Sequence, residues 1–379
     1  MDRLGIFVFY DASGIVDRYV EVLLQGLLPY LKKLVIVVNG DITQESEERL
    51  EKYTDLIFHR ENKGYDCEAY KDVVLSFLAA EDWSAWDEVI LFNGTFYAPI
   101  FPWKDVFDKM ENEPADFWGL TRYPGGGKCS SPGPWLQKEI PEHLQGYFLV
   151  CRKKMVCSDD FLYFFQTLSE IRTHVEAVWF YEIKFTSFFK SRGYSSKAYI
   201  EVCEQKIDIL QGKDPSMEYP FEMVSKLKFP LVKRNAFSLG NFIQAEKTLQ
   251  FIKEHTEYDV NLIYEHLGRL VKENRFSPFN PILLEKFYFS HKNVYIFGHG
   301  KVGKNLAAYF EYKGWKNAGF IVSADSNSAR HRTENIYVLG DKKFGPDDGV
   351  VIGLMRGFED VYPVIRREIP DECLFLPKL

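Results

Sequence analysis

The chain has 379 residues, 46% of them hydrophobic and 27% charged, so it is long enough for two domains and has the composition of a globular protein. A formal net charge of −7 argues against a nucleic-acid-binding protein, because contacts with phosphates require a basic face. No apolar run approaches the ~20 residues of a membrane-spanning helix, and the six cysteines form neither a CxxC pair nor a disulfide pattern.

The amino-terminal part of the chain alternates short apolar runs with helical patterns. The apolar runs predict strands, and the segments between them carry apolar residues at helical spacing. In chain order, we expect strands at residues 5–10, 34–38, 56–58 and 88–92, and helices at residues 16–28 and 45–53. This alternation is typical of a parallel sheet with crossover helices, so the expected fold class is α/β with a mostly parallel sheet.

Polar residues and glycines follow the ends of these strands. Ligands of open α/β sheets bind at the carboxyl ends of strands, and Asn, Asp and Thr side chains can hydrogen-bond to ribose and sugar hydroxyls. We therefore expect a donor site for a sugar nucleotide at Tyr10, Asp11, Asn39, Asn62, Gly64, Tyr65, Asp66, Asn93 and Thr95. Each loop alone is explained as well by an ordinary strand-to-helix turn, and Asp11 by a helix N-cap.

The middle of the chain adds three further features. Residues 125–135 are too rich in Gly and Pro for a helix or a central strand. They predict either a mobile loop that closes over the substrates, with Trp135 as a sugar platform, or an inert surface insertion. Residues 142–150 predict a strand in which His143 and Gln145 share one face. Residues 179–190 predict a helix with Glu182 in its first turn, a position that acidic residues favour for electrostatic reasons alone.

Four sequence strings resemble the rhamnan synthesis protein F family, which comprises bacterial polysaccharide glycosyltransferases of GT-A type. The strings are ENKGYDCEAYKD, DEVILFNGTFYAPIFP, DFWGLT and HLQGYFLVCRKK, and the resemblance extends over residues 1–240. It implies a GT-A-like domain that transfers rhamnose or a related hexose from a dTDP- or UDP-linked nucleotide-sugar donor to a glycan or lipid-linked glycan acceptor during synthesis of a cell-surface polysaccharide.

The resemblance also implies roles for particular residues. His143 and Gln145 match a His-Leu-Gln motif and would contact acceptor or donor, and Glu182 would be the general base of an inverting reaction. Gly94 stands where the family has the Asp of Asn-Asp-Ser, a position at which GT-A enzymes commonly hold a divalent metal. The resemblance thus makes Mg²⁺ or Mn²⁺ a possible cofactor. Because Gly94 replaces the acidic residue, we expect a weak metal site or none.

The carboxyl-terminal part of the chain contains a second α/β pattern. A strand at residues 293–297 runs into Gly298, Gly300 and Gly303, and a helix at residues 304–313 follows. This glycine spacing between a strand and a helix is the dinucleotide fingerprint, and Asp325 lies where a ribose would be read. Further strands are expected at residues 320–322, 336–338, 350–352 and 373–375.

The predicted organisation has three parts. Residues 1–203 form the GT-A-like domain, residues 204–290 a helical connector with helices at 239–255 and 260–273, and residues 291–379 a small Rossmann-like domain. Two other functions stay open: a non-catalytic sugar- or nucleotide-binding protein on a decayed transferase fold, and an NAD(P)-binding protein that uses the carboxyl-terminal domain. We expect a cytoplasmic chain, which could lie at the inner face of the cell membrane, with at most peripheral membrane contact, no nucleic-acid partner and the possibility of a homo-oligomer.

Overall fold

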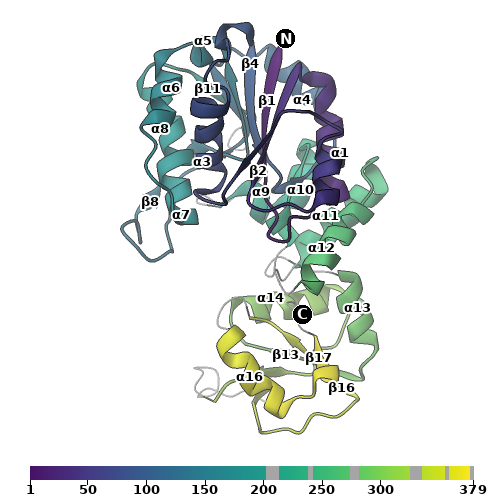
Figure 1. Cartoon of the computed structure of the whole chain (residues 1–379). Helices are drawn as coiled ribbons and strands as arrows, with labels where there is room; N and C mark the ends of the chain where they lie inside the picture. The colour runs from purple at the N-terminus through teal and green to yellow at the C-terminus, as the bar shows by residue number, and fades with distance from the viewer. Residues whose placement is uncertain (202–212, 238–241, 274–280, 325–334, 355–357, 376–379) are drawn as a thin grey trace. The chain divides into compact units, whose positions relative to one another are not determined.

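The computed structural model describes residues 1–201, 213–237, 242–273, 281–324, 335–354 and 358–375 (Figure 1). They divide into two compact units. The first contains Met1–Lys233 and His255–Tyr258, and the second contains Arg234–Glu254 and Asp259–Leu379. Within the described ranges, none of the helices is both long and apolar enough to cross a membrane.

The first unit is built around a mixed sheet whose strand order is β11-β6-β10-β4-β1-β2-β3, with β9 paired to β6. The strands are β1 (Arg3–Phe9), β2 (Lys33–Asn39), β3 (Ile57–Arg60), β4 (Glu88–Asn93), β6 (Phe117–Tyr123), β9 (His143–Leu144), β10 (Phe148–Arg152) and β11 (Ser196–Ile200). Strands β1 to β4 are parallel neighbours, whereas β10 runs antiparallel between β4 and β6. The α/β fold class with a mostly parallel sheet is thus confirmed.

The register of the four parallel strands brings their carboxyl ends to one edge. Val8 of β1 pairs with Asn93 of β4, and Val38 of β2 pairs with His59 of β3. Phe9 pairs with Val38, so all four strands end at nearly the same level. The polar loops that follow the strands therefore leave the sheet side by side.

Helices cover both faces of this sheet. Figure 1 shows α1 and α4 on one side of the sheet and α3, α6 and α8 on the other. The helices of the first unit are α1 (Arg18–Leu27), α2 (Gln44–Leu50), α3 (Tyr65–Asp72), α4 (Trp103–Glu111), α5 (Lys153–Val156), α6 (Asp159–Gln166), α7 (His174–Ala177), α8 (Lys184–Ser191), α9 (Pro215–Glu218) and α10 (Pro220–Leu227). Two short ribbons complete the unit: β5 (Phe96–Tyr97) with β12 (Val232–Lys233), and β7 (Gly127–Lys128) with β8 (Glu139–Ile140).

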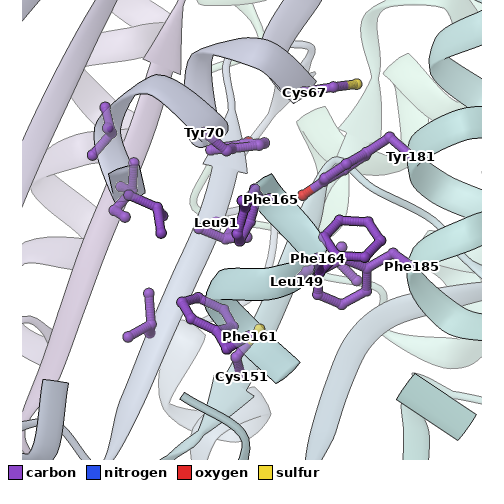
Figure 2. Close-up of a cluster of buried hydrophobic side chains, with 14 of the residues drawn as sticks. Cys67, Tyr70, Leu91, Leu149, Cys151, Phe161, Phe164, Phe165, Tyr181 and Phe185 are labelled. Atoms are coloured by element: carbon purple, nitrogen blue, oxygen red, sulfur yellow. The ribbon is translucent and has the colours of Figure 1, made fainter. Parts of the chain in front are cut away.

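Aromatic residues make up 16% of the chain. Many of them pack together in one hydrophobic core, between the sheet and the helices α3, α6 and α8. Figure 2 shows rings from α3, α6 and the helix around Tyr181 meeting Leu91 of β4 and Leu149 of β10. Phe164 and Phe185 pack edge to face with ring centroids 5.0 Å apart, a favoured aromatic geometry. This packing fixes the helix that carries Glu182 against the sheet.

Three expectations about local structure were wrong. The helix predicted at residues 179–190 begins at His174, after a capping box at Thr173, and it continues through a π-helical segment, Val178–Ile183, into α8. The strand predicted at residues 142–150 is interrupted between β9 and β10, because the chain changes partners from β6 alone to both β4 and β6. Asp11 is not a helix N-cap, since α1 begins only at Arg18.

The second unit contains a small parallel sheet of order β15-β14-β13-β16-β17. Its strands are β13 (Asn293–Phe297), β14 (Phe320–Val322), β15 (Ile336–Val338), β16 (Asp348–Ile352) and β17 (Leu374–Phe375), and its helices are α11 (Phe242–His255), α12 (Asn261–Lys272), α13 (Pro281–Phe289), α14 (Lys301–Tyr312) and α16 (Phe358–Glu368). Counted along the chain, this is the order 3-2-1-4-5 of a doubly wound fold, so the expectation of a small parallel carboxyl-terminal sheet is confirmed.

Candidate functional site

An open pocket of about 820 Å³ lies at the carboxyl ends of β1, β2 and β3. It is lined by Tyr10, Asp11, Ala12, Gly40, Asp41, Ile42, His59, Arg60, Glu61 and Asn62. Tyr10 exposes 45% of its surface here, so its ring is accessible to a ligand. Of the residues expected at the first three strand ends, Tyr10, Asp11 and Asn62 line this pocket, whereas Asn39, Gly64, Tyr65 and Asp66 are not among its lining residues.

Two of the residues expected to bind the nucleotide-sugar donor, Asn39 and Asp11, instead stabilise the loops around the pocket. The buried Asn39 donates from Nδ2 to Asn62 Oδ1 (3.2 Å) and to the Tyr65 carbonyl oxygen (3.3 Å), and its Oδ1 accepts from Arg60. Asp11 Oδ1 accepts from the backbone N–H groups of residues 13 and 15, at 2.9 and 3.2 Å. Both side chains organise the loops on which exposed groups such as Asn62 are presented.

The loop that leads into α3 is held in an unusual conformation. Gly64 and Tyr65 both have left-handed backbone angles, with φ of 65° and 58°. At Gly64 an added Cβ would lie 2.1 Å from Cδ of Glu68, whose Oε1 accepts a 2.7 Å hydrogen bond from the N–H of Ile171. Glycine is therefore required there, and the conformation leaves the Tyr65 ring 41% exposed beside His174.

The end of β4 is linked to the third loop through side chains. Asn93 Nδ2 donates to Asp66 Oδ2 at 2.6 Å, and Asn93 Oδ1 accepts from the Thr95 N–H and hydroxyl at 3.1 and 2.6 Å. The side chains that the structure describes bring no three His, Cys, Asp or Glu residues together in a metal-binding arrangement. At this loop the carboxyl of Asp66 is the group that could coordinate Mg²⁺ or Mn²⁺, and such an ion would take most of its ligands from water and from phosphate oxygens.

Glu182 lies on the π-helical segment and packs directly on Gly146. A Cβ at position 146 would fall 2.9 Å from Cγ of Glu182. The Glu182 side chain is 29% exposed, and its Oε2 lies 3.7 Å from Nε2 of His143. π-Helical turns often occur at functional sites, and here the turn lies in mid-helix, so the carboxylate is not explained by the preference of acidic residues for a first helical turn.

The surroundings of Glu182 favour its ionised form. Burial by itself raises the pKa of this carboxyl. A hydrogen bond from His143 and the positive charge of that residue oppose the rise, and the charges of Lys233 and His174 add smaller effects. Together these effects bring the pKa of Glu182 below its ordinary value. His143 is held in place by a 2.8 Å hydrogen bond between Nδ1 and the Pro141 carbonyl oxygen, and by stacking on the Tyr123 ring. A half-exposed carboxylate of this kind can accept a proton from a bound hydroxyl.

Gln145 belongs to a separate hydrogen-bond network beside Glu182. Its Nε2 donates to Asp214 Oδ2 at 2.7 Å, and its Oε1 accepts from the Thr121 hydroxyl at 2.6 Å. The Thr121 hydroxyl also shares a short hydrogen bond with the Tyr147 hydroxyl. Because both ends of the Gln145 amide are satisfied inside the protein, this residue positions its neighbours.

The strand-end residues and Glu182 are close enough to influence each other. Burial raises the pKa of Asp66, and the negative charge of Glu182 adds to that rise, while the hydrogen bond from Asn93 opposes it. The charges of Asp66 and Glu182 therefore act on each other, and Asp66 is joined to the end of β4 through Asn93. None of these three residues is among those that line the pocket at Tyr10 and Asn62.

The structure adds three residues to those expected from the sequence: Arg60, Gly146 and Lys233. Arg60 holds the third loop, with Nε 2.8 Å from Asp72 Oδ2 and a guanidinium nitrogen 2.7 Å from the Lys63 carbonyl oxygen. Gly146 directly follows the His-Leu-Gln motif, which was the one local signal for it. Of the glycine motif in the second unit, Gly298, Gly300 and Gly303 are described, whereas Asp325 lies outside the described residues.

The glycine motif has the close packing that its spacing predicts. Gly298 has a left-handed φ of 101°, and a Cβ at Gly303 would lie 2.0 Å from the Gly298 carbonyl oxygen. A Cβ at Gly300 would meet nothing within 4 Å. The first and third glycines thus allow α14 to pack on β13, while the second faces open space at the start of the helix.

Solved structures with similar arrangements are distant in sequence. The 4-diphosphocytidyl-2C-methyl-D-erythritol synthase of Anaerococcus prevotii is 14% identical, with a TM-score of 0.34 over 55% of this chain and 93% of that chain. Core-mannan synthase A of Aspergillus fumigatus, in its Mn/GDP form, is 9% identical, with a TM-score of 0.26 over 47% of this chain and 66% of that chain. The mannosyltransferase Ktr4p of S. cerevisiae in complex with GDP is 11% identical, with a TM-score of 0.28 over 52% and 67%. Similarity at this level assigns no activity to the chain.

Sequence comparisons identify the family. The protein y4gN of Sinorhizobium fredii is 25% identical over 191 residues, which are 50% of this chain and 46% of that protein. The chain therefore spans about half the length of this curated relative. A family model described as rhamnan synthesis protein F matches residues 34–311, a range that includes Asn93, Glu182 and Lys233. Because this match covers well over half of its length, the chain belongs to the rhamnan synthesis protein F family.

Proposed function

We propose that the chain is a glycosyltransferase of cell-surface polysaccharide synthesis, which transfers rhamnose or a related hexose from a dTDP- or UDP-linked donor to a glycan or lipid-linked glycan acceptor. The observation that carries this proposal is the setting of Glu182, a partly exposed carboxylate that packs on Gly146, faces His143 and has surroundings that favour its ionised form. Membership of a rhamnan synthesis family supports the same class of substrate.

In the proposed reaction, Glu182 is the general base of a single displacement. Its carboxylate takes the proton from an acceptor hydroxyl while that oxygen attacks the anomeric carbon of the donor. The bond between the anomeric carbon and the diphosphate oxygen breaks, and the nucleoside diphosphate leaves with its electron pair. A donor of β-configuration, such as dTDP-β-L-rhamnose, would then give an α-linked product.

Different residues would contact different parts of the nucleotide-sugar donor. The exposed Tyr10 and Asn62 would contact the nucleoside, since they line the pocket with free surface. Asp66, Asn93 and Thr95 would lie nearer to the diphosphate and the sugar, because they are hydrogen-bonded to one another at the end of β4 and Asp66 is influenced by the charge of Glu182. Asn39, Asp11 and Gln145 would act through the loops they hold.

The proposal is tested by measuring release of nucleoside diphosphate and formation of product with a panel of dTDP- and UDP-linked sugars. We expect Glu182→Gln to lower kcat by about 10²- to 10⁴-fold, because general base catalysis is typically worth this much. Nucleotide affinity measured by calorimetry should change little, since the variant keeps the shape of the side chain. NMR of the product anomer then reports inversion or retention.

A matched control is Glu170→Gln, which removes the same charge from a side chain that is 52% exposed and forms an ion pair with Arg172. Its turnover should equal that of the wild type. Wild-type turnover in Glu182→Gln would contradict the base assignment. Nucleotide binding by the wild type without turnover of any donor would favour the second candidate, a binding protein on a decayed transferase fold. The residues that motivate this candidate are Gly94, Cys67 and Glu68, which depart from the family's pattern.

The second unit suggests a separate candidate, nucleotide binding by the carboxyl-terminal domain that we propose for residues 291–379. The open surface at Gly300 and the 3-2-1-4-5 strand order favour it. A thermal-shift series with NAD(H) and NADP(H) tests this candidate, and an unchanged melting temperature at millimolar concentrations would exclude it.

A further inference from the structure

We infer that Lys233 is the cation that holds the diphosphate of the donor and meets the negative charge that develops on it as it leaves. This inference rests on the proposed function, because it requires a nucleoside diphosphate donor. Lys233 belongs to the basic stretch at residues 226–234, for which the sequence alone leaves open contact with a diphosphate, contact with an anionic lipid surface, or a solvated face. The inference selects one residue of this stretch, and it explains how the site could work with Gly94 in place of an acidic residue.

The backbone of Lys233 is fixed beside the loop that follows β4. Lys233 and Val232 form β12, which pairs antiparallel with β5, and Lys233 is the register partner of Phe96. The N–H of Ile100 donates to the carbonyl oxygen of Pro230 at 2.7 Å and extends this contact. Phe96 directly follows Thr95, so the pairing places the lysine backbone next to the Asn93–Thr95 loop.

The side chain of Lys233 is directed by an aromatic platform. Its Nζ lies 4.0 Å from the centroid of the Tyr147 ring, a cation–π distance. The Tyr147 hydroxyl is bonded to Thr121, and its ring packs edge to face on Phe96 with centroids 5.8 Å apart. The Tyr147 ring is therefore held in place by both contacts, and the ammonium group lies over the ring of the residue that follows Gly146.

Lys233 is linked to two parts of the site by different observations. Its backbone lies beside the Asn93–Thr95 loop through the pairing of β12 with β5, and its charge favours the ionised form of Glu182. A leaving diphosphate lies on the opposite side of the anomeric carbon from the attacking hydroxyl and its base, so the diphosphate that we place on Lys233 lies on the side of the Asn93–Thr95 loop.

In the proposed reaction a cationic side chain can stabilise the negative charge of the departing diphosphate. A departing diphosphate needs preorganised positive charge in a partly desolvated site. Lysine supplies a compact positive charge suited to phosphate oxygens.

The experiment compares the affinities of nucleoside, nucleoside monophosphate and nucleoside diphosphate, in the thymidine and uridine series, by calorimetry. The variant Lys233→Met keeps the apolar stem on the Tyr147 ring and removes the charge. We expect it to weaken binding of the diphosphate by about 10- to 100-fold, the value of a charge-assisted hydrogen bond, with nucleoside affinity unchanged. Lys233→Gln should behave in the same way, and Lys233→Arg should retain most of the affinity.

The matched control is Lys226→Gln, which removes a charge from an exposed residue of α10 in the same basic stretch and should bind all three ligands as the wild type does. Melting temperatures identify any variant that fails to fold. Unchanged diphosphate affinity in both Lys233→Met and Lys233→Gln would overturn the inference, and so would an equal loss of nucleoside and diphosphate affinity. If the wild type binds no nucleoside diphosphate at all, the proposed function itself fails.

Discussion

Glu182 and Asp66 are two carboxyl groups of one site whose surroundings shift their pKa values in opposite directions. The pKa of Glu182 lies below the ordinary 4.5, so this group stabilises the fold above that pH, and the stabilisation is lost as the pH falls through its folded-state pKa. The pKa of Asp66 lies above the ordinary 3.8, so its stabilisation is complete below that pH and is lost as the pH rises through its folded-state pKa. Opposite shifts of neighbouring carboxyl groups are typical of sites that divide acid and base roles.

The position of His143 predicts a change in the pH dependence of turnover. We expect the wild type to lose activity on the acid side only below pH 4.5, where Glu182 becomes protonated. His143→Asn keeps an amide that can donate to the Pro141 carbonyl oxygen, but it removes the group that faces Glu182. The pKa of Glu182 should therefore rise, and the acid limb of the profile of kcat/KM against pH should move to higher pH. An acid limb at the same pH in both proteins would show that His143 does not tune the carboxylate.

At the scale of the element, the site depends on the helix from His174 to Ser191 and on the close approach of β9 and β10. The helix contains the π-helical segment Val178–Ile183, which carries Glu182. The Glu182 side chain contacts Gly146, which lies in the link between β9 and β10. The Leu144 N–H donates to the Thr186 hydroxyl at 3.0 Å, so the strand and the helix are also joined by a hydrogen bond. Helix and strand are thus held together without a side chain at position 146.

The contact at Gly146 predicts that an added methyl group would harm activity more than stability. In Gly146→Ala the Cβ would lie 2.9 Å from Cγ and 3.2 Å from Oε1 of Glu182, and it would displace that side chain. Displacement of a catalytic group by about 1 Å can cost about 10²-fold in rate, so we expect a loss of that order in kcat. The melting temperature should fall only slightly, because a half-exposed side chain can move into solvent.

The control for this change is Gly268→Ala in α12, where an added Cβ meets nothing within 4 Å. It should leave kcat unchanged and raise stability by about 0.4–1 kcal/mol, since alanine restricts the unfolded chain more than glycine does. Full activity of Gly146→Ala would show that Glu182 needs no fixed position.

At the scale of the whole molecule, each unit is organised by the carboxyl ends of its parallel strands. In the first unit, four such ends meet at one edge, and β10 and β9 extend the site past β4 towards Glu182. In the second unit, β13 and its glycine turn occupy the centre of the sheet. The chain therefore contains two candidate nucleotide-binding edges, and ligand experiments on the full chain must separate them by using variants of one unit at a time.

The side chains of the loop that follows β4 predict whether the activity of the protein depends on a metal ion. Because Gly94 supplies no carboxylate and Asn93 is bonded to Asp66 and Thr95, we expect transferase activity to persist in excess EDTA. Donor turnover before and after chelation, followed by addition of Mn²⁺ or Mg²⁺, measures this. Strict dependence on Mn²⁺ would contradict the expectation, and it would require ligands other than the Asn93–Thr95 loop.

The sequence by itself determined the order of the elements and the family. Apolar runs and polar strand ends predicted β1 to β4 and the edge at which Tyr10, Asn62 and Asn93 lie, because hydrophobic periodicity and turn chemistry are local properties. The same local signal placed the strand, glycine turn and helix of the second unit. It failed where a segment changed partners, as between His143 and Phe148, because the pairing of a strand depends on the strands that it meets.

Only the tertiary structure decided the role of each polar residue. Asn39 and Gln145 have the same amide chemistry as the exposed Asn62, yet both ends of their amides are hydrogen-bonded inside the protein. A buried polar group must find hydrogen-bond partners, and distant elements supply them. The meeting of Lys233 with Tyr147, and of Glu182 with Gly146 and His143, depends on contacts between segments far apart in the chain. Local periodicity carries no information about such contacts, so they became visible only in the folded molecule.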